Sequence, residues 1–306
     1  MKPKILVLYY TQSGQLKDIL DNIINPIRNQ AEITYAPIEP VTPFKMPWTT
    51  EGFFDCMPEC VQEVPIDIQP MQIPDEDYDL VIFGYQPWFL SPSLPTTGFL
   101  KSEYARILKG KNVVTVVGAR NMWLNAQEKV KNALSNLGAH LRGNIVLVDS
   151  NHNLVSLFTV IRWTFKGQKE ASGMLPEAGV QTPDIHAAER FGPLLLQAAQ
   201  RKQYDTLQAQ LLDSKAVTLK PTLIVLEKRG ITNFRKFAKF IREKGERGNP
   251  ARRPRVKLFQ RLLMMGIFVF SPISGITARL AALLRRKQFS SQLNYFKGVD
   301  FQPEVL

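Results

Sequence analysis

The stretch from Lys4 to Leu16, KILVLYYTQSGQL, constrains the fold of this chain more than any other. It begins with an uncharged apolar and aromatic run, which is typical of a strand buried on both faces of a parallel sheet. The run ends in small, hydroxyl-bearing residues, and a helical pattern begins at Leu16. A strand, a hydroxyl-rich turn and a helix N-terminus together favour phosphate binding, because backbone N–H groups and the helix dipole both attract an anion.

The turn over residues 11–15 restricts the kind of phosphate ligand. It contains no lysine and lacks the GxxxxGK[ST] spacing of nucleoside-triphosphate loops. It also lacks the Gly-x-Gly-x-x-Gly pattern of dinucleotide-binding loops. A neutral loop with hydroxyl groups suits a single terminal phosphate. Taken alone, the stretch also fits an ordinary strand-to-helix turn capped by Ser13.

The turn resembles the phosphate loop of flavodoxin-like proteins, T-x-[ST]-G-x-T, which holds the phosphate of FMN. Here the last hydroxyl position of that pattern is Leu16, so one donor is missing. The resemblance implies FMN as the cofactor. The residues that it assigns to the phosphate are Thr11, Gln12, Ser13, Gly14, Gln15 and Leu16.

Four further apolar runs predict strands, and helical patterns separate them. The strands are expected over 32–35, 78–84, 111–118 and 144–149, and the helices over 16–28, 96–108 and up to residue 137. This alternation predicts an α/β, flavodoxin-like, doubly wound five-stranded parallel sheet of order 2-1-3-4-5. In such a sheet the ligand lies outside the carboxyl ends of the strands, where the loops after strands one, three and four meet.

The second and third of these loops also resemble flavin loops. An aromatic side chain that stacks on the isoalloxazine ring is expected in the second loop, with Trp88 as first choice and Tyr85 as second. The cofactor-binding residues expected in this loop are Tyr85, Gln86, Pro87, Trp88 and Phe89. Those expected in the third loop are Gly118, Ala119, Arg120, Asn121 and Trp123.

Two side chains at this edge are candidates for catalysis. Arg120 would place positive charge near flavin N1 and O2, and a solvated loop cation is the alternative. His152 follows the fifth strand and suits a general acid–base, and a capping or solvent-facing histidine is the alternative. No metal site is expected. Cys56 and Cys60 have no histidine near them, and free thiols in a reducing cytosol are expected instead.

Composition divides the chain into a domain and an extension. Residues 1–215 form the predicted flavodoxin-like domain, with insertions at 36–74 and 154–183, and 216–306 form the extension. The first insertion is expected to be a long loop with one short helix near residues 51–55. The second is expected to hold a helix over 154–165 and a loop over 167–183, before a long helix over 185–212.

The extension carries the excess positive charge. Residues 1–227 hold 21 Lys and Arg against 23 Asp and Glu, whereas 228–306 hold 18 against 4. The apolar stretch 258–284 has a charge-free core of about 17 residues interrupted by Pro272, at the short limit for a span. We therefore expect a basic, amphipathic helical extension that lies along an anionic membrane surface through 228–287. Nucleic acid is not an expected partner, because that apolar block has no use in a phosphate-tracking groove. Packing on the domain itself and a homodimer stay open.

The N-terminus runs directly into the first strand, so no signal peptide is expected. The predicted location is therefore cytoplasmic, with peripheral attachment to the inner face of the membrane as a further expectation.

Beyond the flavin loops, the chain resembles the dialkylresorcinol condensing enzyme family. The supporting stretches are YYTQSGQL, FGYQPWFLSPSLP, VVGARNMW and IVLVDSNHN. The resemblance implies flavin-dependent aromatisation of a lipophilic dialkyl-cyclohexanedione to a dialkylresorcinol, as in aryl-polyene or flexirubin biosynthesis, with a ketosynthase partner. Two alternatives stay open. One is an NAD(P)H-dependent quinone or FMN reductase, and the other is a flavin-less structural partner of the ketosynthase.

Overall fold

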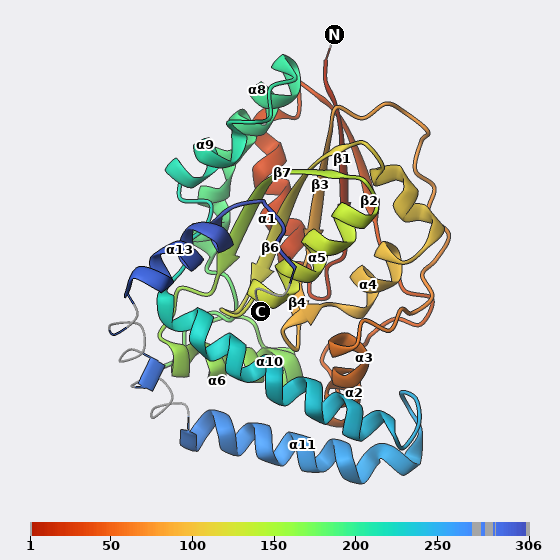
Figure 1. Ribbon diagram of the computed structural model, residues 1–306, viewed down its shortest axis with the longest axis vertical. Helices are drawn as coiled ribbons and strands as arrows, with labels where there is room; N and C mark the ends of the chain where they lie inside the picture. Colours follow the sequence, from red (N-terminus) through yellow and green to blue (C-terminus); the bar gives the residue numbers. More distant parts are fainter. Residues whose placement is uncertain (1, 271–276, 279–283, 285, 304–306) are drawn as a thin grey trace.

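The computed structural model describes residues 2–270, 277–278, 284 and 286–303. Figure 1 shows a central sheet with helices on both faces and a pair of long helices, α10 and α11, across its lower end. Only part of the predicted apolar stretch 258–284 lies within the described residues.

All five strands of the sheet are parallel, in the order β2-β1-β3-β6-β7. Because β6 and β7 are the fourth and fifth main strands along the chain, this is the predicted order 2-1-3-4-5, and the flavodoxin-like fold is confirmed. The strands are β1 (Lys4–Tyr9), β2 (Glu32–Pro37), β3 (Leu80–Tyr85), β6 (Asn112–Ala119) and β7 (His140–Val148). The uncharged run of β1 is buried because β2 and β3 flank it and helices cover both faces.

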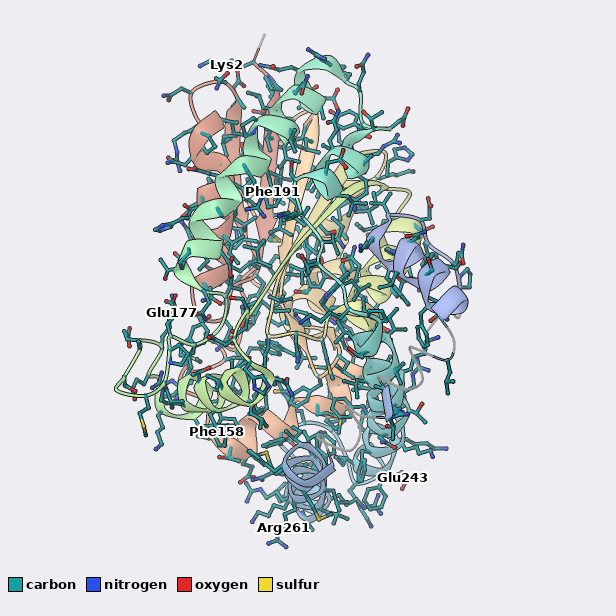
Figure 2. The ribbon with its side chains drawn as sticks, turned by 90° about the vertical axis from the view of Figure 1, so that its left-hand side faces the viewer. Lys2, Phe158, Glu177, Phe191, Glu243 and Arg261 are labelled. Carbon is teal, nitrogen blue, oxygen red and sulfur yellow. The ribbon has the colours of Figure 1, made fainter. Side chains whose placement is uncertain are left out.

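Helices cover the two faces of the sheet in separate layers. On one face α1 (Gln15–Ile24) packs against α7 (Thr182–His186) and the 3₁₀ turn η3 (Ala187–Phe191), and α8 (Gly192–Arg201) lies beside the turn η1 (Asn25–Ile27). Figure 2 shows this layer on the left of the sheet. The connections through α4 (Leu94–Leu100) and α5 (Leu124–Asn136) place those helices on the opposite face, because parallel crossovers are right-handed.

Several expectations about elements differ from the structure. The single helix expected over 185–212 is wrong: the chain forms α7, η3, α8 and α9 (Leu207–Asp213). Gly192 lets the chain pass so close to α1 that a Cβ there would lie 2.2 Å from the Ile23 carbonyl oxygen, and Lys202 turns the chain with φ +51°. The helix expected over 96–108 ends at Leu100 and a 3₁₀ turn, η2 (Glu103–Leu108), follows it.

Two further differences concern strands. The fifth strand begins earlier than expected, at His140, because it pairs with β6 from Asn112 onward. The loop after β3 contains a small antiparallel hairpin, β4 (Pro87–Trp88) with β5 (Ser91–Pro92), which the sequence pattern did not reveal.

Both insertions contribute helices at the carboxyl end of the sheet. The first holds two short helices instead of one, α2 (Thr50–Asp55) and α3 (Met57–Val61). The second holds α6 (Asn153–Lys166) and the loop 167–181. A hydrogen bond from the Trp48 backbone N–H to the Thr164 carbonyl, 2.8 Å, joins the two insertions.

The extension packs on these same elements. It comprises α10 (Pro221–Arg242), the turn η4 (Pro250–Arg252), α11 (Arg253–Met265), the π-helical turn η5 (Gly266–Phe270) and α13 (Arg286–Lys297). α10 packs against α3 and α5, and α11 packs against α2. Arg252, with no exposed surface, joins α11 to the first insertion through Glu59 at 2.7 Å and Asp55 at 2.9 Å. Within the described part of the chain, no helix is both long and apolar enough to cross a bilayer.

Candidate functional site

The turn after β1 keeps the features of a phosphate loop. Gly14 precedes α1 with φ +84°, a left-handed conformation that favours glycine, and α1 has no side-chain cap at its N-terminus. A Cβ on Gly14 would meet no atom within 4 Å, so space is open beside the turn. The Thr11 Oγ1 atom is buried and has no hydrogen-bond partner among the described residues. An anion at this turn would give the hydroxyl and the first-turn amides a partner.

Other side chains of the turn bind neighbouring loops. Gln12 donates its backbone N–H to the Gln86 Oε1 at 2.8 Å and its side-chain amide to the Phe44 carbonyl at 2.9 Å. The Gln15 side chain both donates to the Val180 carbonyl and accepts from its N–H, each at 3.0 Å. The turn is therefore held by the loop after β3 and by both insertions. Leu16 is fully buried, so only its backbone is available to a ligand.

The expected stacking residue Trp88 lies in a group of aromatic rings. Its ring centroid is 5.8 Å from that of Tyr10, 5.1 Å from Phe44 and 5.3 Å from Trp48, all in edge-to-face arrangements. Phe44 and Trp48 come from the first insertion, so that insertion covers the loop after β3. Edge-to-face contacts of this kind stabilise ring positions by about 0.5–1.5 kcal/mol each beyond burial.

Of the other residues expected in the second loop, Gln86 binds the phosphate loop, whereas Tyr85 and Phe89 contact other parts of the structure. Tyr85 is fully buried, and its hydroxyl donates to the Gln127 Oε1 at 2.5 Å within the core. Burial also raises the pKa of the Tyr85 hydroxyl, which therefore stays protonated. Phe89 has φ +49° and packs on Phe53, with ring centroids 4.8 Å apart. The structure thus brings Gln86 to the phosphate loop and Trp88 beside it, and places Tyr85 inside the core.

Arg120 follows β6 and is held by the start of α6. Its guanidinium donates to the Asn153 Oδ1 at 2.6 Å and to the Asn153 carbonyl at 2.9 Å. Asn121 donates to the same Oδ1 at 3.0 Å. Burial lowers the pKa of Arg120, and the nearby Asp149 carboxylate opposes that shift. The residue keeps its charge, since an arginine pKa starts far above neutrality.

His152 lies in front of α6 and is exposed. Its carbonyl accepts the Ser156 N–H at 2.9 Å, but its imidazole does not cap the helix. Asp149, three residues earlier, is buried, and its backbone N–H donates to the carbonyls of Ala119 and Arg120. Asp149 is not among the site residues predicted from the sequence, although its position at the end of the fifth predicted strand was a usable signal.

Unpartnered polar atoms gather at this edge of the sheet. Six buried side-chain atoms after β1, β6 and β7 have no hydrogen-bond partner among the described residues. We call this group the strand-end cluster, and it consists of Thr11 Oγ1, Arg120 Nε, Trp123 Nε1, Asp149 Oδ2, Asn151 Nδ2 and Ser156 Oγ. Buried polar groups in native proteins are normally paired, so these donors and acceptors are available to a polar ligand or to water. The group is the clearest feature of a candidate binding site in the described part of the chain.

A buried carboxylate from the extension lies close to the third loop. The Glu227 Oε1 of α10 accepts the Asn125 N–H at 2.7 Å, in the first turn of α5, whose N-terminus has no cap from its own side chains. Burial raises the pKa of Glu227 to about 7, although the α5 amides oppose the shift. No local sequence pattern predicts this contact, because it joins residues 102 positions apart.

The phosphate half of an FMN site therefore fits the residues present. Thr11, Ser13 and Gly14 with the start of α1 would hold the phosphate, and the third loop would face the ring. No group of His, Cys, Asp or Glu that could hold a metal ion occurs within the described ranges. Cys56 and Cys60 are both free and buried, and burial raises the pKa of the Cys56 thiol to about 12.

The chain is remotely similar to several solved structures. No family model and no curated protein matches the chain. A WrbA-like flavodoxin from Agrobacterium tumefaciens is 11% identical with a TM-score of 0.38, and covers 65% of this chain and 99% of its own. A putative flavoprotein from Bacteroides eggerthii is 18% identical with a TM-score of 0.37 (52% and 96% covered). A Lactobacillus acidophilus flavoprotein in complex with FMN is 17% identical with a TM-score of 0.36 (47% and 93% covered). Likeness at this level does not bear on what this chain binds, and its own strand order remains the basis of the fold assignment.

Proposed function

We propose that this chain is an FMN-dependent oxidoreductase that aromatises a dialkyl-cyclohexane-1,3-dione to a dialkylresorcinol, with a ketosynthase supplying the substrate. The strand-end cluster is the observation that carries the proposal, because it places unpartnered polar groups beside an uncapped helix N-terminus at the ligand edge of a flavodoxin-like sheet. The resemblance of the three loops to flavin loops adds the identity of the cofactor.

Aromatisation of the dione removes one proton and one hydride from neighbouring ring carbons, after which tautomerisation gives the resorcinol. Bound FMN supplies the hydride acceptor. The proton lies next to a carbonyl and is acidic, so a carboxylate or an imidazole is sufficient to take it. Two groups at the end of β7 suit this step, Asp149 with its unpartnered Oδ2 and the exposed His152. Arg120, fixed by Asn153, carries positive charge suited to the developing enolate oxygen.

Titration of the full-length protein with FMN and with riboflavin tests the cofactor step. Riboflavin lacks the phosphate, so the phosphate loop should make FMN bind at least tenfold more tightly. Thr11→Val removes a hydroxyl and keeps the side-chain volume, and it should weaken FMN about tenfold while leaving riboflavin unchanged, as expected for one hydrogen bond to a charged group. Thr34→Val on β2 is the matched control. Equal affinity for the two flavins, or no flavin binding, would contradict the proposal.

Turnover with a synthetic dialkyl-cyclohexane-1,3-dione tests the reaction. The flavin-loaded protein should convert the dione to the resorcinol with an external electron acceptor. Asp149→Asn or His152→Ala should lower the rate about 10²–10⁴-fold without loss of FMN, and the variant that does so identifies the base. Oxidation of NAD(P)H with a quinone, without turnover of the dione, would instead establish the reductase alternative.

A further inference from the structure

The outer face of α11 is apolar. Val256 and Phe259 are buried on its inner side, where they pack on the first insertion and α10. Leu258, Leu262 and Met265 follow one another at helical spacing on the opposite side, with 37–46% of each side chain exposed. The helix therefore presents two apolar faces, of which only the inner one is covered among the described residues.

The apolar face continues onto α6, over 100 residues earlier in the chain. Phe268, just after α11, packs on Phe158 of α6, with ring centroids 5.6 Å apart. Phe158 and Leu154 are both exposed and lie one helical turn apart. We call Leu154, Phe158, Leu258, Leu262, Met265 and Phe268 the apolar ridge. Figure 2 shows α6, with Phe158, and α11, with Arg261, at the same lower end of the molecule.

The apolar ridge holds most of the large exposed apolar side chains. Ten such side chains occur in the described part of the chain, and six of them belong to the ridge. Exposed apolar residues scattered singly are normal, but a concentration at one end marks a contact with another apolar phase.

Cations accompany the ridge. Lys257 and Arg261 on α11 stand next to Leu258 and Leu262, are exposed, and form no ion pair with a described residue.

The other cations of this part of the extension are partly engaged within the molecule. Residues 228–270 hold 13 Lys and Arg against 2 Glu. Several of these arginines are engaged within the molecule: Arg242 and Arg252 contact Glu59, Arg253 pairs with Glu51, Arg255 with Glu243, and Arg247 lies over the Phe44 ring. Arg235, Lys236 and Lys239 on α10 are exposed.

We propose that the apolar ridge and its cations bind the surface of an anionic lipid bilayer, with α11 lying in the plane of the interface. Apolar side chains beside Lys and Arg on one helix are the pattern of interfacial binding, because the former enter the acyl boundary while the latter meet the lipid phosphates. The positive charge beside the ridge is complementary to anionic lipid, and this favours a bilayer over other partners. Nucleic acid would leave the ridge exposed, and a second copy would bring like charges together.

Sedimentation of the full-length protein with vesicles tests the proposal. The protein should bind phosphatidylcholine vesicles that contain about one third phosphatidylglycerol, and bind vesicles of phosphatidylcholine alone at least tenfold more weakly, since each cation contributes roughly fivefold on an anionic surface. Binding should fall as salt rises from about 0.1 to 1 M. Equal binding to both vesicle types would overturn the role of the cations.

Variants on the ridge separate the apolar from the electrostatic contribution. Replacing Leu258, Leu262 and Met265 by Ser should weaken vesicle binding at least tenfold, whereas Met174→Ser, at a side chain 99% exposed outside the ridge, should have no effect. Lys257→Gln with Arg261→Gln should lower binding to anionic vesicles only, with Lys109→Gln and Arg201→Gln as the charge-matched control.

Phe158→Ser tests whether α6 belongs to the surface, and it should weaken binding severalfold. Analytical ultracentrifugation of the unmodified protein measures its oligomeric state and tests the alternative that a second copy covers the ridge. A dimer that the triple Ser variant abolishes, together with unchanged vesicle binding, would show that a second copy covers the ridge and would overturn the proposal.

Discussion

Arg252 holds the extension to the first insertion, and its replacement by Met should cost about 3 kcal/mol of unfolding free energy. The guanidinium has no exposed surface and binds both oxygens of Glu59, at 2.7 and 3.0 Å, as well as Asp55. Removing one partner of a buried ion pair typically costs about 3–5 kcal/mol, because the other charge stays buried. We expect the low end, since Arg242 lies 3.6 Å from Glu59 and compensates in part.

The neighbouring Arg253 offers a matched control. It pairs with Glu51 at 2.7 Å, but both side chains are at least half exposed, so Arg253→Met should cost at most about 1 kcal/mol. Urea unfolding gives both values, and hydrogen exchange should show the loss in α10 and α11. Adding Glu59→Leu to Arg252→Met should recover much of the stability, since a buried apolar pair replaces an unpaired charge. If Arg252→Met and Arg253→Met cost the same, the buried network does not hold the extension.

Two further predictions concern single positions. The pKa of Glu227, about 7 in the folded protein against an ordinary 4.5, means that the folded state binds the proton more tightly, so stability should fall by about 3 kcal/mol as pH rises from below 4.5 to above 7. Glu227→Gln keeps an acceptor for the Asn125 N–H but cannot titrate. In urea unfolding across this pH range, the variant should therefore lack this fall in unfolding free energy, and an unchanged pH dependence would contradict the role of Glu227. Gly192→Ala should cost about 1–3 kcal/mol because its methyl group meets the Ile23 carbonyl at 2.2 Å, and thermal unfolding should show Gly266→Ala, which meets nothing within 4 Å, to be near neutral.

The sheet was predictable because each of its strands has a recognisable local sequence pattern. Each central strand is an apolar run that ends in a turn, and the alternation with helices leaves few topologies. The broken helix after residue 185 was not predictable from periodicity, since its apolar spacing continues across Gly192 and Lys202 while the backbone changes direction there. The β4–β5 hairpin was missed because two residues a strand are too few to show alternation.

The candidate site was predictable only where the sequence pattern lies within a single loop. The phosphate turn is contained in six residues, and its open Gly14 and unpartnered Thr11 have the features expected of it. The remaining contacts join distant parts of the chain, such as Gln15 with Val180, 165 positions apart. No local pattern encodes such a pairing, because the insertion that supplies Val180 has its own periodicity and composition.

The cations of the extension fall into two groups in the structure: some pair with carboxylates of the protein itself, and others are exposed. The first insertion is acidic, and Glu51, Asp55 and Glu59 lie against arginines of the extension, so part of the basic excess is complementary to the protein's own surface. Net charge by sequence segment therefore overestimates what is available to an external partner. Of the cations that remain, Lys257 and Arg261 lie next to the exposed Leu258 and Leu262 on α11 and form no ion pair with a described residue. That placement, more than the size of the charge, is the observation on which we base the proposal of a lipid partner.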